Sequence, residues 1–198
     1  MYNYSHSPRK ALAVDFVGGE SYRLTVPTKA AYDDILTVAQ YIKSQDFCNE
    51  LIEITAKILS FNTENKHFTS EKVKKMFIFD GKKVDFEAMS SIFCAYNDFV
   101  SEVAAEYKLP YYPYAESKKT YYDVNTQFEK LVSDYTKLNF KEIEELPLDT
   151  YLCLLKDAYI YKLSSSQEGL EYLENAYILT QTEPDRKGLR AHFSRKKE

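Results

Sequence analysis

The stretch FEAMSSIFCAYNDFVSEVAAEY, Phe86–Tyr107, has the residue spacing of a long α-helix. Its large apolar side chains recur three or four residues apart, at Met89, Phe93, Tyr96, Val100, Val103 and Tyr107. This spacing places them on one face of an α-helix, whereas a half-buried strand would alternate at every second residue. The stretch therefore predicts a long helix over about residues 86–107, with one face turned toward a core.

The residues before this helix predict a β-hairpin followed by helices. In ALAVDFVGGESYRLTVP, residues 11–27, apolar and polar residues alternate on both sides of Gly18-Gly19, as in a hairpin with a glycine turn. Helical spacing then runs over residues 28–44 and 47–61, a shorter helix is expected from Thr69 or Ser70, and Asp80-Gly81 turns the chain. An isolated hairpin is unstable in water, so we expect it to pack on the helices.

The sequence KLPYYPYAESKK, residues 108–119, interrupts the helical pattern. Pro110 and Pro113 lack a backbone N–H and keep the preceding residue out of the helical region, so an extended segment is expected. We predict a module boundary here, with an N-terminal module at 1–109, a Pro/Tyr linker at 110–119 and a C-terminal module at 120–198. The expected fold is mostly α, with a small N-terminal β-hairpin packed on a helical bundle and an all-helical C-terminal module.

Helical spacing recurs through the C-terminal module. The expected helical segments are 121–135, 140–146, 149–163, 165–177 and 182–193. Asp149 can cap the third, and Ser165 with Glu168 has capping-box spacing at the start of the fourth. Leu170, Leu173 and Tyr177 are expected to continue the apolar stripe of that fourth helix.

Composition narrows the class of protein. The chain has 198 residues, 44% of them hydrophobic, and a formal net charge of −4, so a general nucleic-acid binder with a basic surface is not expected. Cys48, Cys94 and Cys153 form no CxxC pair, and the last two lie among apolar residues, where we expect small core side chains in a reducing compartment. No signal peptide and no membrane span are expected, which favours the cytoplasm.

Motifs typical of catalysis or metal binding are lacking in the sequence. His6, His67 and His192 have no ligand partner at helical spacing, and VGGESY after the first predicted strand is not a dinucleotide-binding motif. Asp33-Asp34 and the acidic residues at 142–145 are interpreted as solvated helix faces. We therefore expect no catalytic residues, no metal site, no cofactor and no enzymatic activity.

The Pro/Tyr run is one of two features that suggest binding to another protein. It offers Tyr111, Tyr112 and Tyr114, and tyrosine suits protein interfaces because it joins a large apolar ring to a polar hydroxyl. Two interpretations remain open. The rings either pack back on one module, which we slightly favour, or bind a partner.

The basic C-terminal tail is the second feature. Arg186, Lys187 and Arg190 lie beside Leu189 and Phe193, which are spaced four residues apart as on one helix face. A basic amphipathic helix can dock into an apolar groove with an acidic rim. The alternative is a solvated chain end, as many termini are.

Three motifs in the C-terminal half resemble a known family. They are YLCLLKDAYIY at 151–161, QEGLEYL at 167–173 and QTEPDRKGLR at 181–190. Together with the hairpin and with TKAAYDDIL, AKILSFN and FCAYNDFV in the first half, they resemble tail assembly chaperones of long-tailed phages and prophages of Gram-positive bacteria. Residues 146–190 are similar to the C-terminal extension that such chaperones acquire through a ribosomal frameshift.

This resemblance implies a non-catalytic phage tail assembly chaperone. Such a protein shields the tape measure protein, recruits tail tube protein, works in the host cytoplasm and is absent from the mature virion. It implies no nucleic acid and no membrane as partners, and it leaves self-association open. The alternative is a small helical phage or host regulatory protein that binds and inhibits a bacterial target.

Overall fold

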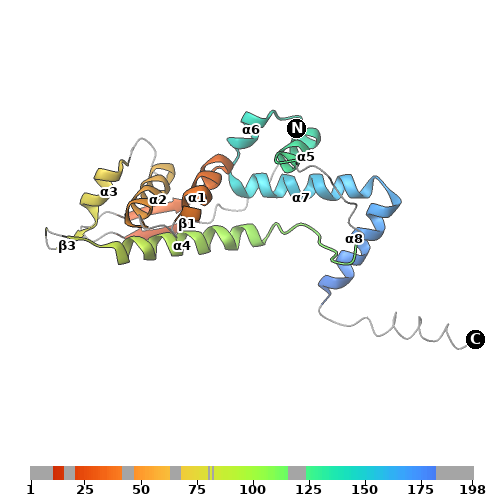
Figure 1. Ribbon diagram of the computed structural model, residues 1–198. Coiled ribbons are helices and arrows are strands. Elements are labelled where there is room, and N and C mark those ends of the chain that lie inside the picture. Colours follow the sequence, from red (N-terminus) through yellow and green to blue (C-terminus); the bar gives the residue numbers. More distant parts are fainter. Residues whose placement is uncertain are drawn as a thin grey trace, which may run out of the picture. The chain divides into compact units, whose positions relative to one another are not determined.

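The computed structural model describes residues 11–15, 21–41, 47–62, 68–79, 81, 83–115 and 124–181, and it is mostly α-helical, as predicted (Figure 1). The chain divides into two compact units. Unit 1 combines residues 1–108 with 126–155, and unit 2 combines residues 109–125 with 156–198.

Unit 1 holds the strands and most of the helices that the structure describes. Their bounds are β1 (Ala11–Asp15), β2 (Ser21–Thr25), α1 (Lys29–Tyr41), α2 (Phe47–Asn62), α3 (Ser70–Met76), β3 (Ile78–Phe79), β4 (Lys83–Val84), α4 (Phe86–Ala105), α5 (Gln127–Thr136) and α6 (Phe140–Glu144). Helix α7 (Leu148–Ser164) contributes residues 148–155 to unit 1 and residues 156–164 to unit 2. Unit 2 continues with α8 (Gln167–Thr180) and includes the non-helical segment 109–115.

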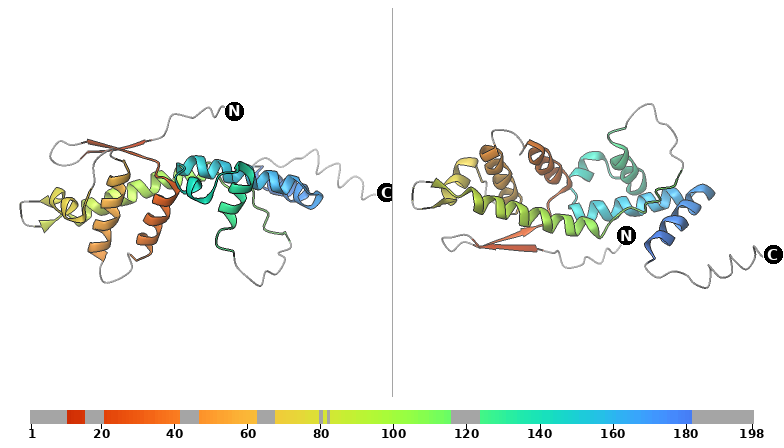
Figure 2. Two further views of the ribbon diagram at one scale, coloured as in Figure 1. Left: turned by 90° about the horizontal axis from the view of Figure 1, so that it is seen from above. Right: turned by 60° about the horizontal axis from the view of Figure 1, so that its bottom comes forward.

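The predicted N-terminal hairpin is confirmed by the pairing of β1 with β2. The strands are antiparallel, from Ala11 opposite Thr25 to Asp15 opposite Ser21, and the glycine turn between them lies outside the described residues. Leu24 of β2 is fully buried, and the Tyr96 hydroxyl of α4 donates a hydrogen bond to the Thr25 carbonyl over 3.1 Å. The hairpin therefore packs on helices, as expected, and Figure 2 shows it along α4.

Helix α2 lies at the centre of unit 1, in contact with α1, α3, α4 and β2. Its buried residues include the predicted Leu51, Ile54 and Ile58, and also Ile52 and Leu59 on other sides. Because neighbours surround it, α2 buries more than the single face that its periodicity predicts. The apolar face predicted for α4 is confirmed at Met89, Tyr96, Val100 and Val103, which are all buried.

A backbone junction brings the later helices into unit 1. The N–H of Leu148 donates to the Pro27 carbonyl over 2.8 Å, and the N–H of Lys29 donates to the Leu146 carbonyl over 2.9 Å. Thr28 and Pro147 form an antiparallel bridge between these two bonds. The start of α7 is thereby fixed beside the start of α1, and residues 126–155 group with the N-terminal residues rather than with 156–198. This division differs from the expected 1–109, 110–119 and 120–198.

Helix α5 begins later than the sequence predicts. It starts at Gln127, and in the described part of the predicted segment Val124, Phe128 and Tyr135 are exposed while Val132 is fully buried. The sequence predicted an apolar stripe through Val124, Phe128, Leu131 and Tyr135, but only Leu131 of these is half-buried, so this stripe is not the buried face of α5. Helix α5 ends at Thr136, and the next residue, Lys137, has a φ of +67°, which lies outside the right-handed helical region.

Two further local predictions need correction. The cap of α8 is Ser166 rather than Ser165, because the Ser166 hydroxyl accepts a hydrogen bond from the Gly169 N–H over 3.1 Å. Cys94 is exposed on α4 rather than buried in the core. The short β3–β4 pair was not predicted, although Gly81 of the predicted turn has the positive φ, +69°, that favours glycine.

Candidate partner-binding cleft

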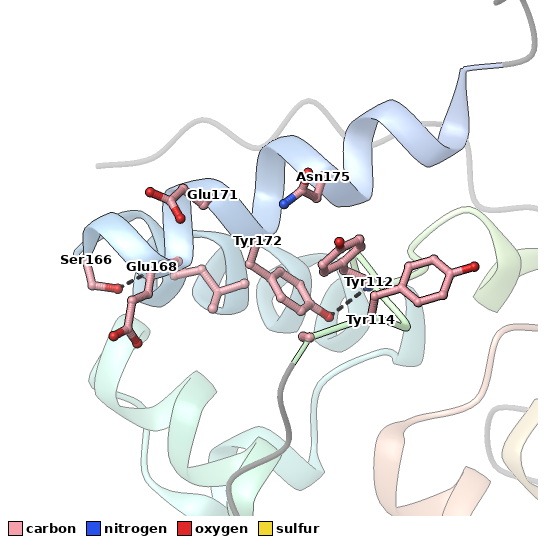
Figure 3. Close-up of a pocket in the computed structure, with 10 residues that line it drawn as sticks. Tyr112, Tyr114, Ser166, Glu168, Glu171, Tyr172 and Asn175 are labelled. Carbon is pink, nitrogen blue, oxygen red and sulfur yellow. Dashed lines mark hydrogen bonds between the residues drawn. The ribbon is translucent and has the colours of Figure 1, made fainter.

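The segment 109–115 lies against α8 through the side chain of Tyr172 (Figure 3). The Tyr172 hydroxyl accepts a hydrogen bond from the Tyr112 N–H over 3.1 Å and donates one to the Pro110 carbonyl over 3.3 Å. The backbone N–H and C=O groups of this extended segment have no hydrogen-bond partners in a helix or a sheet. The single hydroxyl of Tyr172 supplies a partner both for one N–H and for one carbonyl. The Pro/Tyr run is thus part of unit 2.

Four tyrosines surround this junction. The Tyr112 ring packs edge-on against Tyr114 and Tyr172, with centroids 5.7 Å and 6.0 Å away. Such edge-to-face pairs add attraction between the ring edge and the ring face beyond apolar burial. Burial and a hydrogen bond with Tyr172 raise the pKa of Tyr159 to about 12.

A cleft of about 750 Å³ opens beside the tyrosines, between α8 and the segment 109–115 (Figure 3). Its lining includes Tyr112, Tyr114, Glu168, Glu171, Tyr172 and Asn175. The lining therefore includes two glutamates of α8 and three tyrosines, and none of the described lining residues is a lysine or an arginine. A cleft of this composition suits an apolar or positively charged group better than an anion.

The tyrosines of the predicted site differ in exposure. Tyr111 and Tyr114 are 72% and 75% exposed, whereas Tyr112 is half-buried against α8. Tyr112 therefore packs back on unit 2, as the first interpretation of the Pro/Tyr run has it, whereas partner binding by the exposed Tyr111 and Tyr114 stays a prediction. The predicted tail residues lie outside the described part of the chain, and they are Arg186, Lys187, Leu189, Arg190 and Phe193.

Helix α8 presents large apolar side chains to solvent. The exposed apolar residues of α8 are Leu170 (46% exposed), Tyr177 (66%), Ile178 (57%) and Leu179 (52%). The predicted stripe therefore points partly outward, and the buried positions are instead Gly169 and Ala176. At Gly169 a larger residue does not fit, because a Cβ atom there would lie 1.9 Å from the Leu163 carbonyl oxygen at the end of α7.

Unit 1 contains a half-buried ionic cluster made by α1, α5 and α7. The Lys29 ammonium lies 2.6 Å from Asp33 and 2.8 Å from Glu129, and 5.5 Å from the Tyr151 ring centroid. Burial alone would lower the pKa of Lys29, but its hydrogen bonds to Asp33 and Glu129 raise it above the usual value. These contacts tie the three helices together.

The pKa values of Glu129 and Tyr151, which both lie beside Lys29, are shifted in opposite directions. Burial would raise the pKa of Glu129, but the hydrogen bond and charge of Lys29 lower it below the usual value. Burial, followed by the charge of Glu129, raises the pKa of Tyr151 to about 12. All three groups keep their ordinary charge near neutral pH, so the cluster is suited to stabilising helix packing rather than to proton transfer.

Among the described residues, no group of three or more His, Cys, Asp or Glu side chains is placed to hold a metal ion. Within the same ranges, no helix has the length and apolar character needed to cross a membrane. No family model matches the chain, and comparisons with curated proteins and with solved structures also give no match.

Proposed function

We propose that this protein is a non-catalytic assembly chaperone that transiently covers apolar helical surface on a partner protein. The observation that supports it is the set of exposed apolar residues of α8, each about half or more accessible to solvent. Leu170 and Tyr177 are seven residues apart and lie on one side of the helix, Ile178 adjoins Tyr177, and Leu179 lies on the opposite side of the last turn. Exposed apolar surface of this kind is typical of sites for partner proteins.

The resemblance to tail assembly chaperones suggests which partner this is. In that interpretation the exposed apolar residues of α8 cover helices of the tape measure protein before the tail is assembled. The tail tube protein is the second partner, and the exposed Tyr111 and Tyr114 offer it a separate aromatic surface. An apolar side chain that becomes fully buried contributes about 1.5–3 kcal/mol, so a few half-buried contacts give the modest affinity that release during assembly requires.

The proposed function predicts that polar substitutions on α8 weaken chaperoning without unfolding the chain. The double change Leu170→Ser and Tyr177→Ser removes two exposed apolar groups and is expected to weaken binding about tenfold. The measurement is the soluble fraction of the tape measure protein from the same genome when it is co-expressed with the full chain. We expect that fraction to fall to the level seen without the chaperone.

Leu36→Ser is the matched control for this experiment. Leu36 is an exposed leucine, 38% accessible, on α1 of unit 1, so the same chemical change there should leave the soluble fraction unaltered. Circular dichroism should show equal helicity in all variants. Equal rescue by wild type and by the double variant would refute the role of α8.

A further inference from the structure

We propose that the C-terminal tail, residues 182–198, folds back on α8 and covers its exposed apolar face until a partner protein displaces it. This inference rests on the proposed function, because it concerns the same surface of α8, and it adds a form of regulation. The covering segment belongs to the same chain, so the contact forms at an effective concentration set by the short connection to α8.

The face of α8 that is to be covered combines apolar side chains with one carboxylate. Its four residues occupy positions i, i+4, i+7 and i+8 on one side of the helix, all four are exposed, and they are Leu170, Glu174, Tyr177 and Ile178. Glu174 lies within about one turn of each of the other three. A purely apolar cover would leave this carboxylate without a partner in a region that loses water, which is unfavourable. A suitable occupant therefore brings apolar groups and a cation together.

The sequence of the tail has this combination. The tail lies outside the described part of the chain. Four of its residues are spaced i, i+3, i+4 and i+7, as on one face of a helix, and they are Arg186, Leu189, Arg190 and Phe193. That face would present two apolar side chains and two arginines.

The charges of the two segments are complementary. The tail contains six lysines and arginines and three acidic residues, whereas α8 contains three glutamates and no lysine or arginine. Opposite charges on two facing segments favour their association and fix their register. The tail is therefore the segment of this chain that suits the exposed face of α8 in both polarity and charge.

The connection between α8 and the tail has the length that an antiparallel helix pair needs. Helix α8 ends at Thr180, and Pro184 suits the first turn of a following helix, because the missing N–H of proline has no helical partner there. Loops of about two to five residues join antiparallel helices. A loop over residues 181–183 would place Arg190 opposite Glu174, and both apolar tail residues would fall within residues 170–178 of α8.

Amide hydrogen exchange of α8 in the free full-length protein tests the contact. The double change Leu189→Ser and Phe193→Ser removes the apolar part of the cover, so exchange in residues 174–180 should become about tenfold faster. Equal exchange in wild type and in this variant would overturn the proposal.

Charge reversal tests the pairing of Arg190 with Glu174. Arg190→Glu should accelerate exchange in α8 about threefold, and adding Glu174→Arg should restore the wild-type rate. Lys187→Glu is the matched control, because the same change of charge would lie off the covering face and should leave exchange in α8 unaltered. A paired reversal that restores nothing would overturn the proposed register.

Peptide binding separates this inference from the proposed function. The probe is an amphipathic helical peptide with a leucine face and one tryptophan, and its fluorescence reports binding directly because the chain contains no tryptophan. We expect the Leu189→Ser and Phe193→Ser variant to bind it about tenfold more tightly than wild type, because the cover no longer competes. Equal binding by both proteins would overturn the regulation but retain the proposed function. Binding by neither would overturn the proposed function, while the exchange rates would still decide whether the tail contacts α8.

Discussion

Replacing Gly169 by alanine is expected to lower the free energy of opening of α8 by about 3 kcal/mol, the upper range for overpacking a close contact. A Cβ atom at this position would lie 1.9 Å from the Leu163 carbonyl oxygen and 2.6 Å from its carbon. Both are backbone atoms, so no side-chain rotation can relieve the overlap, and α8 must move away from the end of α7. Residue-by-residue amide hydrogen exchange in α8 measures the loss.

Gly81→Ala is the matched control for that substitution. Nothing lies within 4 Å of a Cβ built on Gly81, but its φ of +69° disfavours any residue with a side chain. We expect a loss of about 1 kcal/mol, from backbone strain alone, and no change in α8. Because the Gly169 change also displaces Tyr172, it should weaken partner binding. Unchanged exchange in α8 after Gly169→Ala would contradict the close approach of the two helices.

Replacing Lys29 by methionine is expected to destabilise unit 1 by about 2 kcal/mol, the range for hydrogen bonds to charged groups. The change leaves Glu129, whose side chain is only 19% exposed, without the ammonium 2.8 Å away. It also removes the link between α1 and α5 while keeping a side chain of similar length. Urea-induced unfolding followed by circular dichroism measures the difference from wild type.

An exposed ion pair and the pH dependence provide the controls. Lys130→Met breaks the ion pair with Asp134, in which both side chains are more than 60% exposed. This change should alter the free energy of unfolding by less than about 0.5 kcal/mol. The Glu129 contribution is present above the ordinary glutamate pKa of 4.5 and is lost as pH falls, because its folded pKa is lowered. The gap between wild type and Lys29→Met should therefore shrink in acid. A gap that stays constant down to pH 2 would show that charge is not its origin.

The parts of the fold that periodicity predicted are those where a helix buries a single face. Helix α4 is such a case, since Met89, Tyr96, Val100 and Val103 all face the core. Helix α2 contacts elements on several sides, so its burial exceeds any single stripe. The prediction for helix α5 failed for another reason. Val132 is its fully buried residue, whereas the larger Phe128 and Tyr135 are exposed.

The candidate site was predicted only where its residues stand out locally. The prolines and tyrosines of residues 110–114 are conspicuous in any reading of the sequence. Tyr172 is not, and no local pattern reveals that its hydroxyl binds the backbone of Pro110 and Tyr112, about 60 residues away in sequence. The boundary between the two units could not be predicted from the sequence for the same reason, because backbone hydrogen bonds near Pro27 and Leu148 join segments that are distant in the chain.

The most direct test of the chaperone account is a map of the partner contact on the full-length protein. Backbone amide chemical shifts would be recorded by NMR with and without an amphipathic helical peptide that carries a leucine face. The account predicts that the changes concentrate on α8, around Leu170–Leu179. Changes confined to unit 1, or an unchanged spectrum at saturating peptide, would contradict it.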